Sequence, residues 1–272
     1  MKKVLVISDL QTGSMFSNWP EDFPIKNGGT WKLNYKQMLI RNAWNQFCDK
    51  MSKIKPDILV INGDVIEGHQ EKNLGITTVT TNLREQASAA AVILSPLVQI
   101  VKEVYFVKGT SYHDRETSGP VDAIAKELGA VPFRKGQYTD WVLNLEIDKV
   151  IINFVHRISI ASGLYRATPP DREGIWSALA GISKVPAADC CVRSHVHFYC
   201  HVEHSSKHII ITPGWQYQTD YQISKSYYRM QPEIGGVLLH VYPENKGKED
   251  DPIYVQKIII KLPREKTIIS QA

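Results

Sequence analysis

The sequence is poor in the features that mark disulfide-stabilised or metal-finger proteins. Its 272 residues include four cysteines, and none belongs to a Cys-x-x-Cys pair or to a zinc-finger spacing with histidine. Cys190 and Cys191 lie inside an apolar run, where cysteine usually acts as a small buried side chain. The pattern argues against a zinc finger or a redox motif and fits a reducing, cytoplasmic setting.

Long apolar runs are also missing. The longest, such as residues 209–212 and 258–260, are far too short to cross a bilayer. The chain opens with Met1-Lys2-Lys3 and passes directly into a strand pattern, without an apolar leader segment. We therefore expect a soluble, cytoplasmic protein with no membrane partner.

A large excess of one sign of charge is missing as well. The formal net charge is +4 at pH 7, and charged residues make up 22% of the chain. This is not the dense basic stripe of an obligate nucleic-acid binder, although it permits a polyanionic substrate. We find no internal repeat and no low-complexity linker, and 43% of the residues are hydrophobic. We predict a single domain over residues 1–272, while its oligomeric state stays open.

Three β-branched apolar runs alternate with helical patterns in the first half of the chain. The runs are residues 3–9, 57–64 and 103–109. Such runs are typical of strands buried on both faces. Residues 35–55 follow a helical period, as do residues 82–102, where Pro96 should kink or break the helix. The alternation predicts parallel strands joined by right-handed crossovers.

The second half of the chain is richer in strands. Shorter helices are expected at residues 120–128 and 172–184. The predicted strands are residues 141–147, 150–156, 189–194, 208–212, 236–242 and 254–262. Several are joined by short turns, so antiparallel pairing is expected. The fold class is α/β, with mixed sheets flanked by helices.

Polar side chains stand where the predicted strands end, which is where functional groups gather in α/β sheets. They are Asp9, Asp64, His156, His195 and His197. Singly, each fits a cap, a turn or a structural hydrogen bond. Together, two carboxylates and three imidazoles would be costly to bury without a divalent cation. On an extended segment His195 and His197 would project to the same side and could each serve one of two metals, with Asp64 bridging.

These motifs resemble those of the calcineurin-like metallophosphoesterases. That family carries, in order, Asp-x-His, Gly-Asp, Gly-Asn-His-Asp, a single His and Gly-His-x-His, each at a strand end. The corresponding motifs here are Asp9-Leu-Gln11, Gly63-Asp64, Gly109-Thr110-Ser-Tyr-His113-Asp114, His156 and Ser194-His-Val-His197. The resemblance implies a calcineurin-like sandwich of mixed sheets flanked by helices, with a dinuclear metal site at the carboxyl ends of the strands.

The resemblance also implies a set of metal ligands. Those of the first metal are Asp9, Gln11, Asp64 and His197. Those of the second are Asp64, His156 and His195, with Thr110 in the place of a further ligand. Mn²⁺ is the first choice for both, with Zn²⁺, Fe²⁺ or Mg²⁺ as alternatives, and a bridging water would be the nucleophile. Gln11 replaces the family's His and Thr110 its Asn, which predicts weaker metal binding than usual.

By the same resemblance, His113 would protonate the leaving oxygen and Asp114 would orient its ring. Two residues, Ser111 and Tyr112, are inserted before this histidine relative to the family pattern. The alternative is that His113 is itself a metal ligand, in place of the missing Asn.

Other residues bear on the substrate. Arg157 and Arg193 adjoin proposed ligands and are candidates for binding phosphate oxygens, with ordinary surface or ion-pair roles as the alternative. Glu67 is either a support for the site or a polar loop residue. Residues 215–221 and 225–229 interleave aromatic rings with cations, which suits base stacking, although a core edge or a subunit contact explains them equally well.

A narrower resemblance, to phosphoesterases encoded by bacteriophages and prophages, extends over nearly the whole chain. Its motifs are Gly63-Asp-Val-Ile-Glu-Gly68, Gly109-Thr-Ser-Tyr-His113, Pro213-Gly-Trp-Gln216 and Ile234-Gly-Gly236. It would place the protein in a host cytoplasm. The leading hypothesis is a metal-dependent phosphoesterase for phosphate esters, phosphodiesters ahead of monoesters, with a nucleotide or nucleic acid as substrate. The alternatives are a binding or scaffold protein with weakened chemistry and a phosphoprotein phosphatase.

Overall fold

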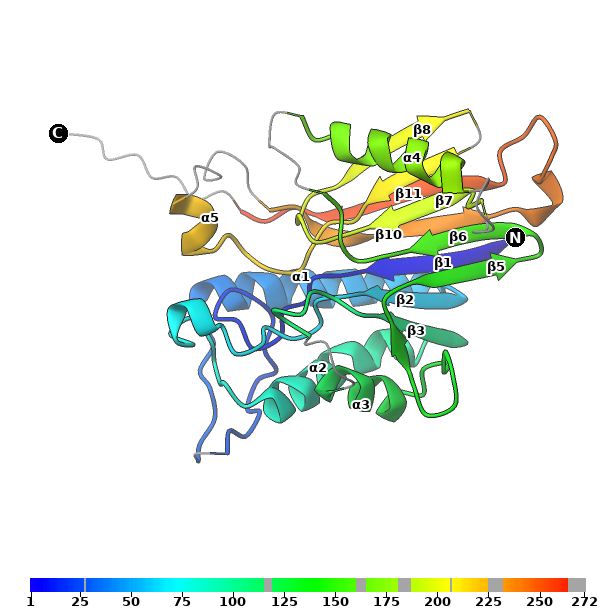
Figure 1. Ribbon diagram of the computed structural model, residues 1–272. Coiled ribbons are helices and arrows are strands. Elements are labelled where there is room, and N and C mark those ends of the chain that lie inside the picture. The colour runs from blue at the N-terminus through cyan, green and yellow to red at the C-terminus, as the bar shows by residue number, and fades with distance from the viewer. Residues whose placement is uncertain are drawn as a thin grey trace.

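The computed structural model describes residues 1–26, 28–114, 119–159, 165–180, 187–205, 207–224 and 232–263. Two mixed sheets pack face to face, and helices cover both outer faces (Figure 1). The predicted α/β class with mixed sheets flanked by helices is therefore confirmed. Within the described ranges, no helix combines the length and the apolar character needed to cross a bilayer.

The first sheet has the order β11-β10-β1-β2-β3-β4. Its parallel strands are β1 (Lys2–Ile7), β2 (Ile58–Asn62), β3 (Glu103–Val107) and β4 (Thr139–Asp140). Its antiparallel strands are β10 (Ile234–Val241) and β11 (Ile253–Ile260). The short edge strand β4 was not predicted, because two residues carry too little pattern to recognise.

Three helices cover the outer face of this sheet. They are α1 (Tyr35–Ile54), α2 (Leu83–Val98) and α3 (Pro120–Glu127). Asn34 starts α1 with a capping box, because its side chain accepts from the backbone of Gln37 while the Gln37 side chain accepts from the backbone of Asn34. Pro96 lies inside the last turn of α2, which ends at Val98 rather than near residue 102.

The second sheet has the order β5-β6-β7-β9-β8. Its strands are β5 (Leu143–Ile147), β6 (Val150–Phe154), β7 (Cys190–Arg193), β8 (Cys200–His204) and β9 (Lys207–Ile211). The pair β5–β6, joined by a short turn, is antiparallel as expected, and so is β8–β9. The three central strands β6, β7 and β9 are parallel. β8 was not predicted, because it is a half-exposed edge strand without apolar alternation.

The helix α4 (Thr168–Ala180) covers the second sheet and contacts β7, β8 and β9. It begins earlier than the predicted residue 172, with two prolines in its first turn, where proline is tolerated. The remaining short helices are α5 (Asp220–Ser224), η1 (Glu71–Asn73) and η3 (Pro243–Asn245).

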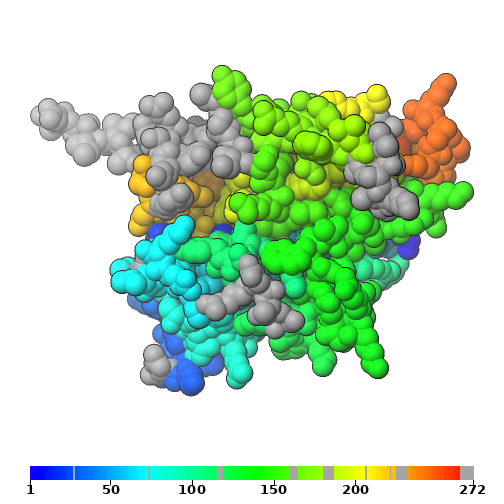
Figure 2. All heavy atoms as spheres, in the orientation of Figure 1, coloured from blue at the N-terminus to red at the C-terminus, as the bar shows by residue number. Residues whose placement is uncertain are grey.

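Apolar side chains fill both layers beside the first sheet. Along β1, Val4 and Val6 face the second sheet, whereas Leu5 and Ile7 face α1 and α2. This explains why the strand is a continuous apolar run. In the space-filling view the cyan segments of the first half of the chain lie in the lower part of the face shown, and the yellow segments of the second sheet lie at the top (Figure 2). The carboxyl ends of β1 and β2 lie at the same end of the sandwich as those of β6 and β7 (Figure 1).

Candidate metal centre

Strand-end residues of both sheets meet at this end of the sandwich. Asp9, Asp64, His156 and His195 each offer a ligand atom, and these four atoms lie within 4.8 Å of one another. His197 joins them through Asp9, with its Nε2 3.4 Å from Asp9 Oδ1. The carboxylates follow β1 and β2 of the first sheet, and the imidazoles follow β6 and β7 of the second.

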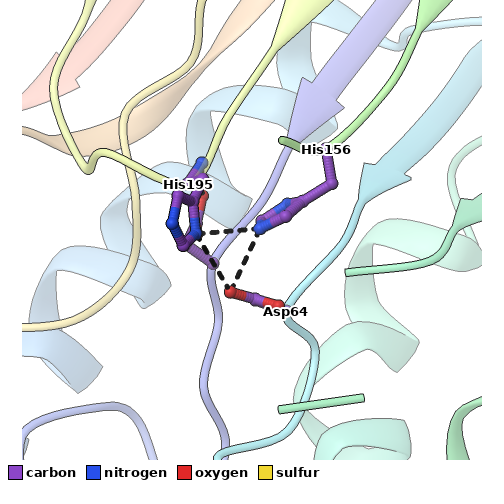
Figure 3. A group of neighbouring side chains, drawn as sticks. Asp64, His156 and His195 are labelled. Atoms are coloured by element: carbon purple, nitrogen blue, oxygen red, sulfur yellow. Dashed lines mark hydrogen bonds and ion pairs between the residues drawn. The ribbon is translucent and has the colours of Figure 1, made fainter. Parts of the chain in front are cut away.

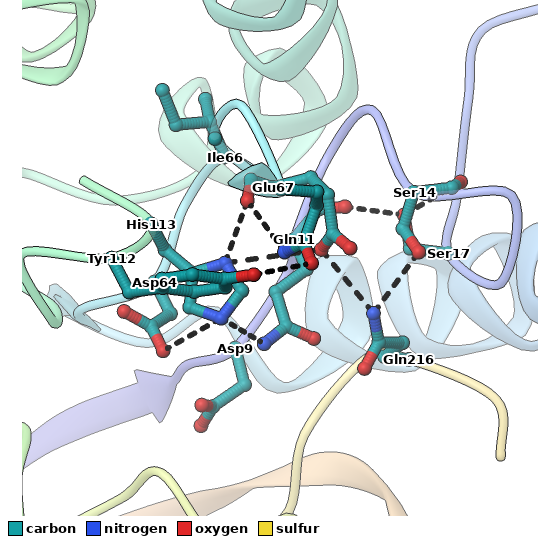
Figure 4. Close-up of polar contacts among 12 residues, drawn as sticks. Asp9, Gln11, Ser14, Ser17, Asp64, Ile66, Glu67, Tyr112, His113 and Gln216 are labelled. Carbon is teal, nitrogen blue, oxygen red and sulfur yellow. Dashed lines mark hydrogen bonds and ion pairs between the residues drawn. The ribbon is translucent and has the colours of Figure 1, made fainter. Parts of the chain in front are cut away.

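Asp64 occupies the middle of the group. Its Oδ1 accepts hydrogen bonds from the backbone N (2.6 Å) and Oγ1 (3.0 Å) of Thr110. Its Oδ2 lies 3.1 Å from His156 Nε2, 3.8 Å from His195 Nδ1 and 3.9 Å from His113 Nε2 (Figures 3 and 4). One carboxylate oxygen is thus anchored, and the other faces three imidazoles.

Asp9 is arranged in the same way. Its Oδ2 accepts from Ser8 Oγ (2.6 Å) and from the backbone N of His195 (3.2 Å). Its Oδ1 faces His197 Nε2 at 3.4 Å and His156 Nε2 at 3.8 Å. The hydrogen bonds to Oδ2 therefore aim the other oxygen into the group.

The inward-facing atoms of the group fit a divalent cation. Within the described part of the chain, Asp9 Oδ1, Asp64 Oδ2, His156 Nε2 and His195 Nδ1 are buried and have no hydrogen-bond partner. Unsatisfied buried polar atoms are costly, and a bound cation would satisfy all four together. His156 Nδ1 lies 2.7 Å from the backbone O of Asn62, which is the usual second contact of a metal-binding histidine.

Opposite charges shift the pKa values within the group. Burial would raise the pKa of both carboxyls, but His197 and His156 hold that of Asp9 below its usual value. His156 and His113 likewise hold the pKa of Asp64 well below its usual value. Burial would lower the pKa of His156, but Asp64 and Asp9 raise it to about 10. A cation bound here would therefore replace a proton on His156.

The backbone at the centre is strained. Asp9, Gln11, Asp64, His195 and His197 have φ values of 52°, 44°, 51°, 81° and 56°. Left-handed backbone costs a non-glycine residue roughly 1–2 kcal/mol. The spacing of the two histidines predicted an extended segment. This prediction is wrong, because β7 ends before His195 and both histidines have left-handed backbone. The strained turn instead directs His195 to Asp64 and His197 to Asp9.

Glycines leave room for this packing. Gly63 has a φ of 85°, and a Cβ on it would collide with the His156 ring and lie 2.7 Å from Gly109 Cα. A Cβ on Gly109 would in turn collide with the backbone and carboxylate of Asp64. Both glycines are therefore required for the strand ends to approach so closely.

Gln11 and Thr110 stand beside the four-residue group. Gln11 is buried, its Nε2 lies 3.4 Å from His113 Nε2, and its Oε1 has no partner among the described residues. Thr110 donates to Asp64 and so orients that carboxylate. The predicted role of each as a direct metal ligand stays a prediction.

The predicted contact between Asp114 and the His113 ring is wrong. The Asp114 carboxylate instead accepts from the backbone N of Asp64 (2.9 Å), Val65 (3.0 Å) and Gly109 (2.8 Å). A turn in which the N–H groups of His113 and Asp114 both donate to the Thr110 carbonyl places Asp114 behind the centre. Burial and the nearby Asp64 charge raise the pKa of Asp114 to about 7.

The His113 ring is oriented by Glu67. His113 Nδ1 lies 2.7 Å from the Glu67 carbonyl, which leaves Nε2 facing Asp64 and Gln11 (Figure 4). The buried Glu67 side chain accepts from Gln216 Nε2 at 3.3 Å. Burial, together with the charge of Asp64, raises the pKa of Glu67 well above its usual value. Of the two interpretations of Glu67, the structure favours a support for the site.

The predicted phosphate-binding role of Arg193 is also wrong. The residue is 5% exposed and faces α4, where its Nε donates to Glu173 Oε1 at 3.1 Å. Its Nη1 donates to the backbone O of Val192 at 2.8 Å. Arg193 is on the outer face of the second sheet because side chains alternate along β7. Arg157, in contrast, is exposed and lies directly after His156.

Replacing Arg193 with methionine is expected to lower the free energy of unfolding by about 1–3 kcal/mol, because it leaves Glu173 and a buried carbonyl without their donor. Metal content should not change. Denaturant unfolding and elemental analysis measure the two effects, with Arg157→Met as the matched exposed control. A stable Arg193→Met variant with weakened phosphate binding would contradict the structural role.

The aromatic segment proposed for base stacking is mostly core. Trp215 is fully buried, with its ring centroid 4.6 Å from that of Trp44 and 5.0 Å from that of Phe47, and Tyr217 is buried as well. These two rings cannot stack on a base, so the core interpretation holds for them. Residues 225–229 lie outside the described residues.

A second group of candidate ligands was missed by sequence analysis. His201, Glu203 and His208 lie within 4.8 Å of one another, near the amino end of β9. His208 Nδ1 is 2.9 Å from His201 Nε2, and its Nε2 is 2.9 Å from Asp251 Oδ2. The two histidines form a hydrogen-bonded chain with Asp251, so their facing nitrogens already have partners, unlike those of the first centre. The His-x-Glu alternation on a strand was its only sequence signal.

No protein-family model matches the chain, and no curated protein matches its sequence. Solved structures resemble it at low identity. Wild-type Vps29 complexed with Zn²⁺ from Entamoeba histolytica is 12% identical, with a TM-score of 0.45 over 94% of this chain and 98% of that one. A novel archaeal phosphodiesterase is 12% identical, with a TM-score of 0.45 over 95% and 99%. A dimetal phosphatase from Danio rerio is 11% identical, with a TM-score of 0.45 over 94% and 95%.

Proposed function

We propose that the chain is a metal-dependent phosphoesterase of the calcineurin-like class, acting on phosphate esters and on phosphodiesters ahead of monoesters. The observation that supports this most is the convergence of four buried ligand atoms from two sheets, none with a hydrogen-bond partner among the described residues, with Asp64 in their middle. Oxygen and imidazole ligands in this mixture suit Mn²⁺ first, and Zn²⁺, Fe²⁺ or Mg²⁺ as alternatives.

We assign Asp9, Gln11 and His197 to one metal, His156 and His195 to another, and Asp64 to both. When bound, such cations supply an activated water and neutralise charge on the phosphoryl oxygens. The protein orients the ligand atoms. Thr110 donates to one carboxylate oxygen of Asp64 and Ser8 donates to one of Asp9, so the other oxygen of each carboxylate faces the centre.

His113 has two candidate roles, of which we place proton donation to the leaving oxygen first. The alternative is metal ligation, because His113 repeats the arrangement of His156. Each ring has Nδ1 2.7 Å from a backbone carbonyl, and each directs Nε2 towards Asp64 Oδ2. A histidine held this way suits either role.

Replacing Gln11 with histidine is expected to tighten Mn²⁺ or Zn²⁺ binding by roughly 10-fold, because imidazole is a stronger ligand than a neutral amide. Titration calorimetry measures the affinity. Gln99→His, on the exposed end of α2, controls for adventitious binding to a new imidazole. An affinity unchanged relative to Gln99→His would place Gln11 outside the ligand set.

Metal analysis and an activity screen test the proposed function directly. The purified protein is assayed with Mn²⁺ against bis-p-nitrophenyl phosphate, p-nitrophenyl phosphate, nucleotides, and single- and double-stranded DNA. We expect turnover that chelation abolishes and Mn²⁺ restores. Metal binding without any turnover would favour the scaffold alternative. The nucleotide and nucleic-acid substrates, and a host cytoplasmic location, follow from the narrower resemblance to phage phosphoesterases.

A further inference from the structure

A pocket of about 240 Å³ opens directly beside the metal centre. Its lining includes His156 and Thr110, which both contact Asp64. Trp141 and the cations Lys108 and Arg157 line it as well. We call this the Trp141 pocket. His156 belongs to both the pocket and the centre, so a group attached to a phosphate at the centre can enter the pocket.

Sheet topology explains why an aromatic ring and two cations gather here. β3 and β4 are parallel and pair Val107 with Asp140, so the next residues, Lys108 and Trp141, emerge side by side at the carboxyl ends of the strands. Lys108 N donates to the Asp140 carbonyl at 2.8 Å, and Lys108 Nζ lies 5.6 Å from the Trp141 ring centroid. Arg157 reaches the same place because it follows His156 at the end of β6.

The position of Trp141 distinguishes it from the other tryptophans. Trp19, Trp44 and Trp215 are buried in the core, and the exposed Trp176 lies on α4, whereas Trp141 is 42% exposed and lines a pocket beside a polar centre. An exposed indole next to cations suits a planar ligand that carries negative charge. The pocket is smaller than the roughly 300–1,000 Å³ typical of sites for drug-sized ligands, so it suits one ring system with its sugar.

We infer that the Trp141 pocket binds the base of a nucleotide substrate, which stacks on Trp141 while its phosphate reaches the metal centre. Lys108 and Arg157 attract the phosphate. This inference rests on the proposed phosphoesterase function and names the substrate class of the same site. Stacking on one indole does not distinguish the bases, so binding is expected to tolerate any base.

The test compares two ligands of the Mn²⁺-loaded protein by calorimetry, thymidine 5′-monophosphate and inorganic phosphate. Loss of base stacking typically weakens binding by about 10- to 100-fold. Trp141→Ala should therefore weaken the binding of thymidine monophosphate by this factor and leave the affinity for inorganic phosphate unchanged. Trp141→Phe should keep most of the affinity for thymidine monophosphate. Trp176→Ala is the matched control, because Trp176 is 68% exposed on α4, away from the pocket.

A kinetic pair gives an independent measurement. The p-nitrophenyl ester of thymidine 5′-monophosphate and methyl p-nitrophenyl phosphate share a leaving group, and only the first carries a base. Trp141→Ala should lower kcat/KM for the first by about 10- to 100-fold and leave the second unchanged.

The outcomes separate the two proposals. If phosphate binds, the methyl ester is hydrolysed and Trp141→Ala keeps the parent affinity for thymidine monophosphate, the pocket assignment is overturned and the phosphoesterase function stands. If phosphate does not bind and neither ester is hydrolysed, the phosphoesterase function fails and this inference fails with it. Because Trp141 is exposed, its replacement should not alter thermal unfolding, which checks that a lost affinity is not misfolding.

Discussion

Replacing Asp64 with asparagine is expected to reduce bound metal and to lower kcat by about 100- to 1,000-fold, more than any change at Arg157 or Arg193. Asp64 Oδ2 faces three imidazoles, so losing its charge weakens both halves of the centre at once. Asparagine retains an oxygen for Thr110, so the local fold should persist. Elemental analysis and steady-state kinetics with Mn²⁺ measure the two effects.

Asp57→Asn is the matched control. Asp57 precedes the amino end of β2, whereas Asp64 follows its carboxyl end, and it is also a hydrogen-bonded carboxylate, held by Lys3 and Lys102. Its replacement should leave metal content and turnover unchanged. If Asp64→Asn binds metal and turns over like the parent protein, Asp64 is not a shared ligand and the assignment of the centre is wrong.

Replacing His113 with alanine is expected to lower kcat by roughly 10²–10⁴-fold on alkyl or nucleoside phosphodiesters and to leave metal content intact. These substrates have poor leaving groups that need a proton. p-Nitrophenolate needs little help in leaving, so the loss on p-nitrophenyl esters should be much smaller. Kinetics on both substrate types, with metal analysis of the variant, measure the dependence.

Equal losses on both substrate types would reject proton donation by His113. Loss of metal in the variant would instead make His113 a ligand, which its resemblance in geometry to His156 also allows. His240→Ala is a suitable control, because that ring lies on β10 and bonds Gln256 of β11 rather than any residue of the centre.

The central fold could be predicted because its determinants are local. A strand buried on both faces must be apolar at nearly every position, so β1 and β2 can be recognised in the sequence as continuous apolar runs. Asp9 and Asp64 follow directly after these runs. Parallel strands place these ends at one edge, which is why the carboxylates could be expected to meet. Their role as ligands stays a prediction.

What could not be predicted depends on contacts between distant elements. The outward direction of Arg193 follows from its register on β7 and from Glu173 on α4, and neither is visible in its neighbours along the chain. The left-handed backbone of His195 and His197 replaces the extended geometry that a His-x-His spacing predicts. Such conformations are imposed by surrounding packing and not by local sequence preference.

Aromatic residues show the same limit. Trp215 is followed by polar residues in the sequence but is fully buried, whereas Trp141 follows a short edge strand and is exposed beside the centre. Composition distinguishes neither case, because a tryptophan suits both a core and a ligand surface.

The candidate ligands come from opposite layers and from distant parts of the chain. Asp9 and Asp64 are translated well before His156, His195 and His197, and the two groups meet only when the second sheet docks on the first. Contacts between such distant segments form late and slowly in folding. Until then the carboxylates lack the imidazoles that complete the centre. The rate at which a refolding chain takes up metal therefore reports when its two sheets come together.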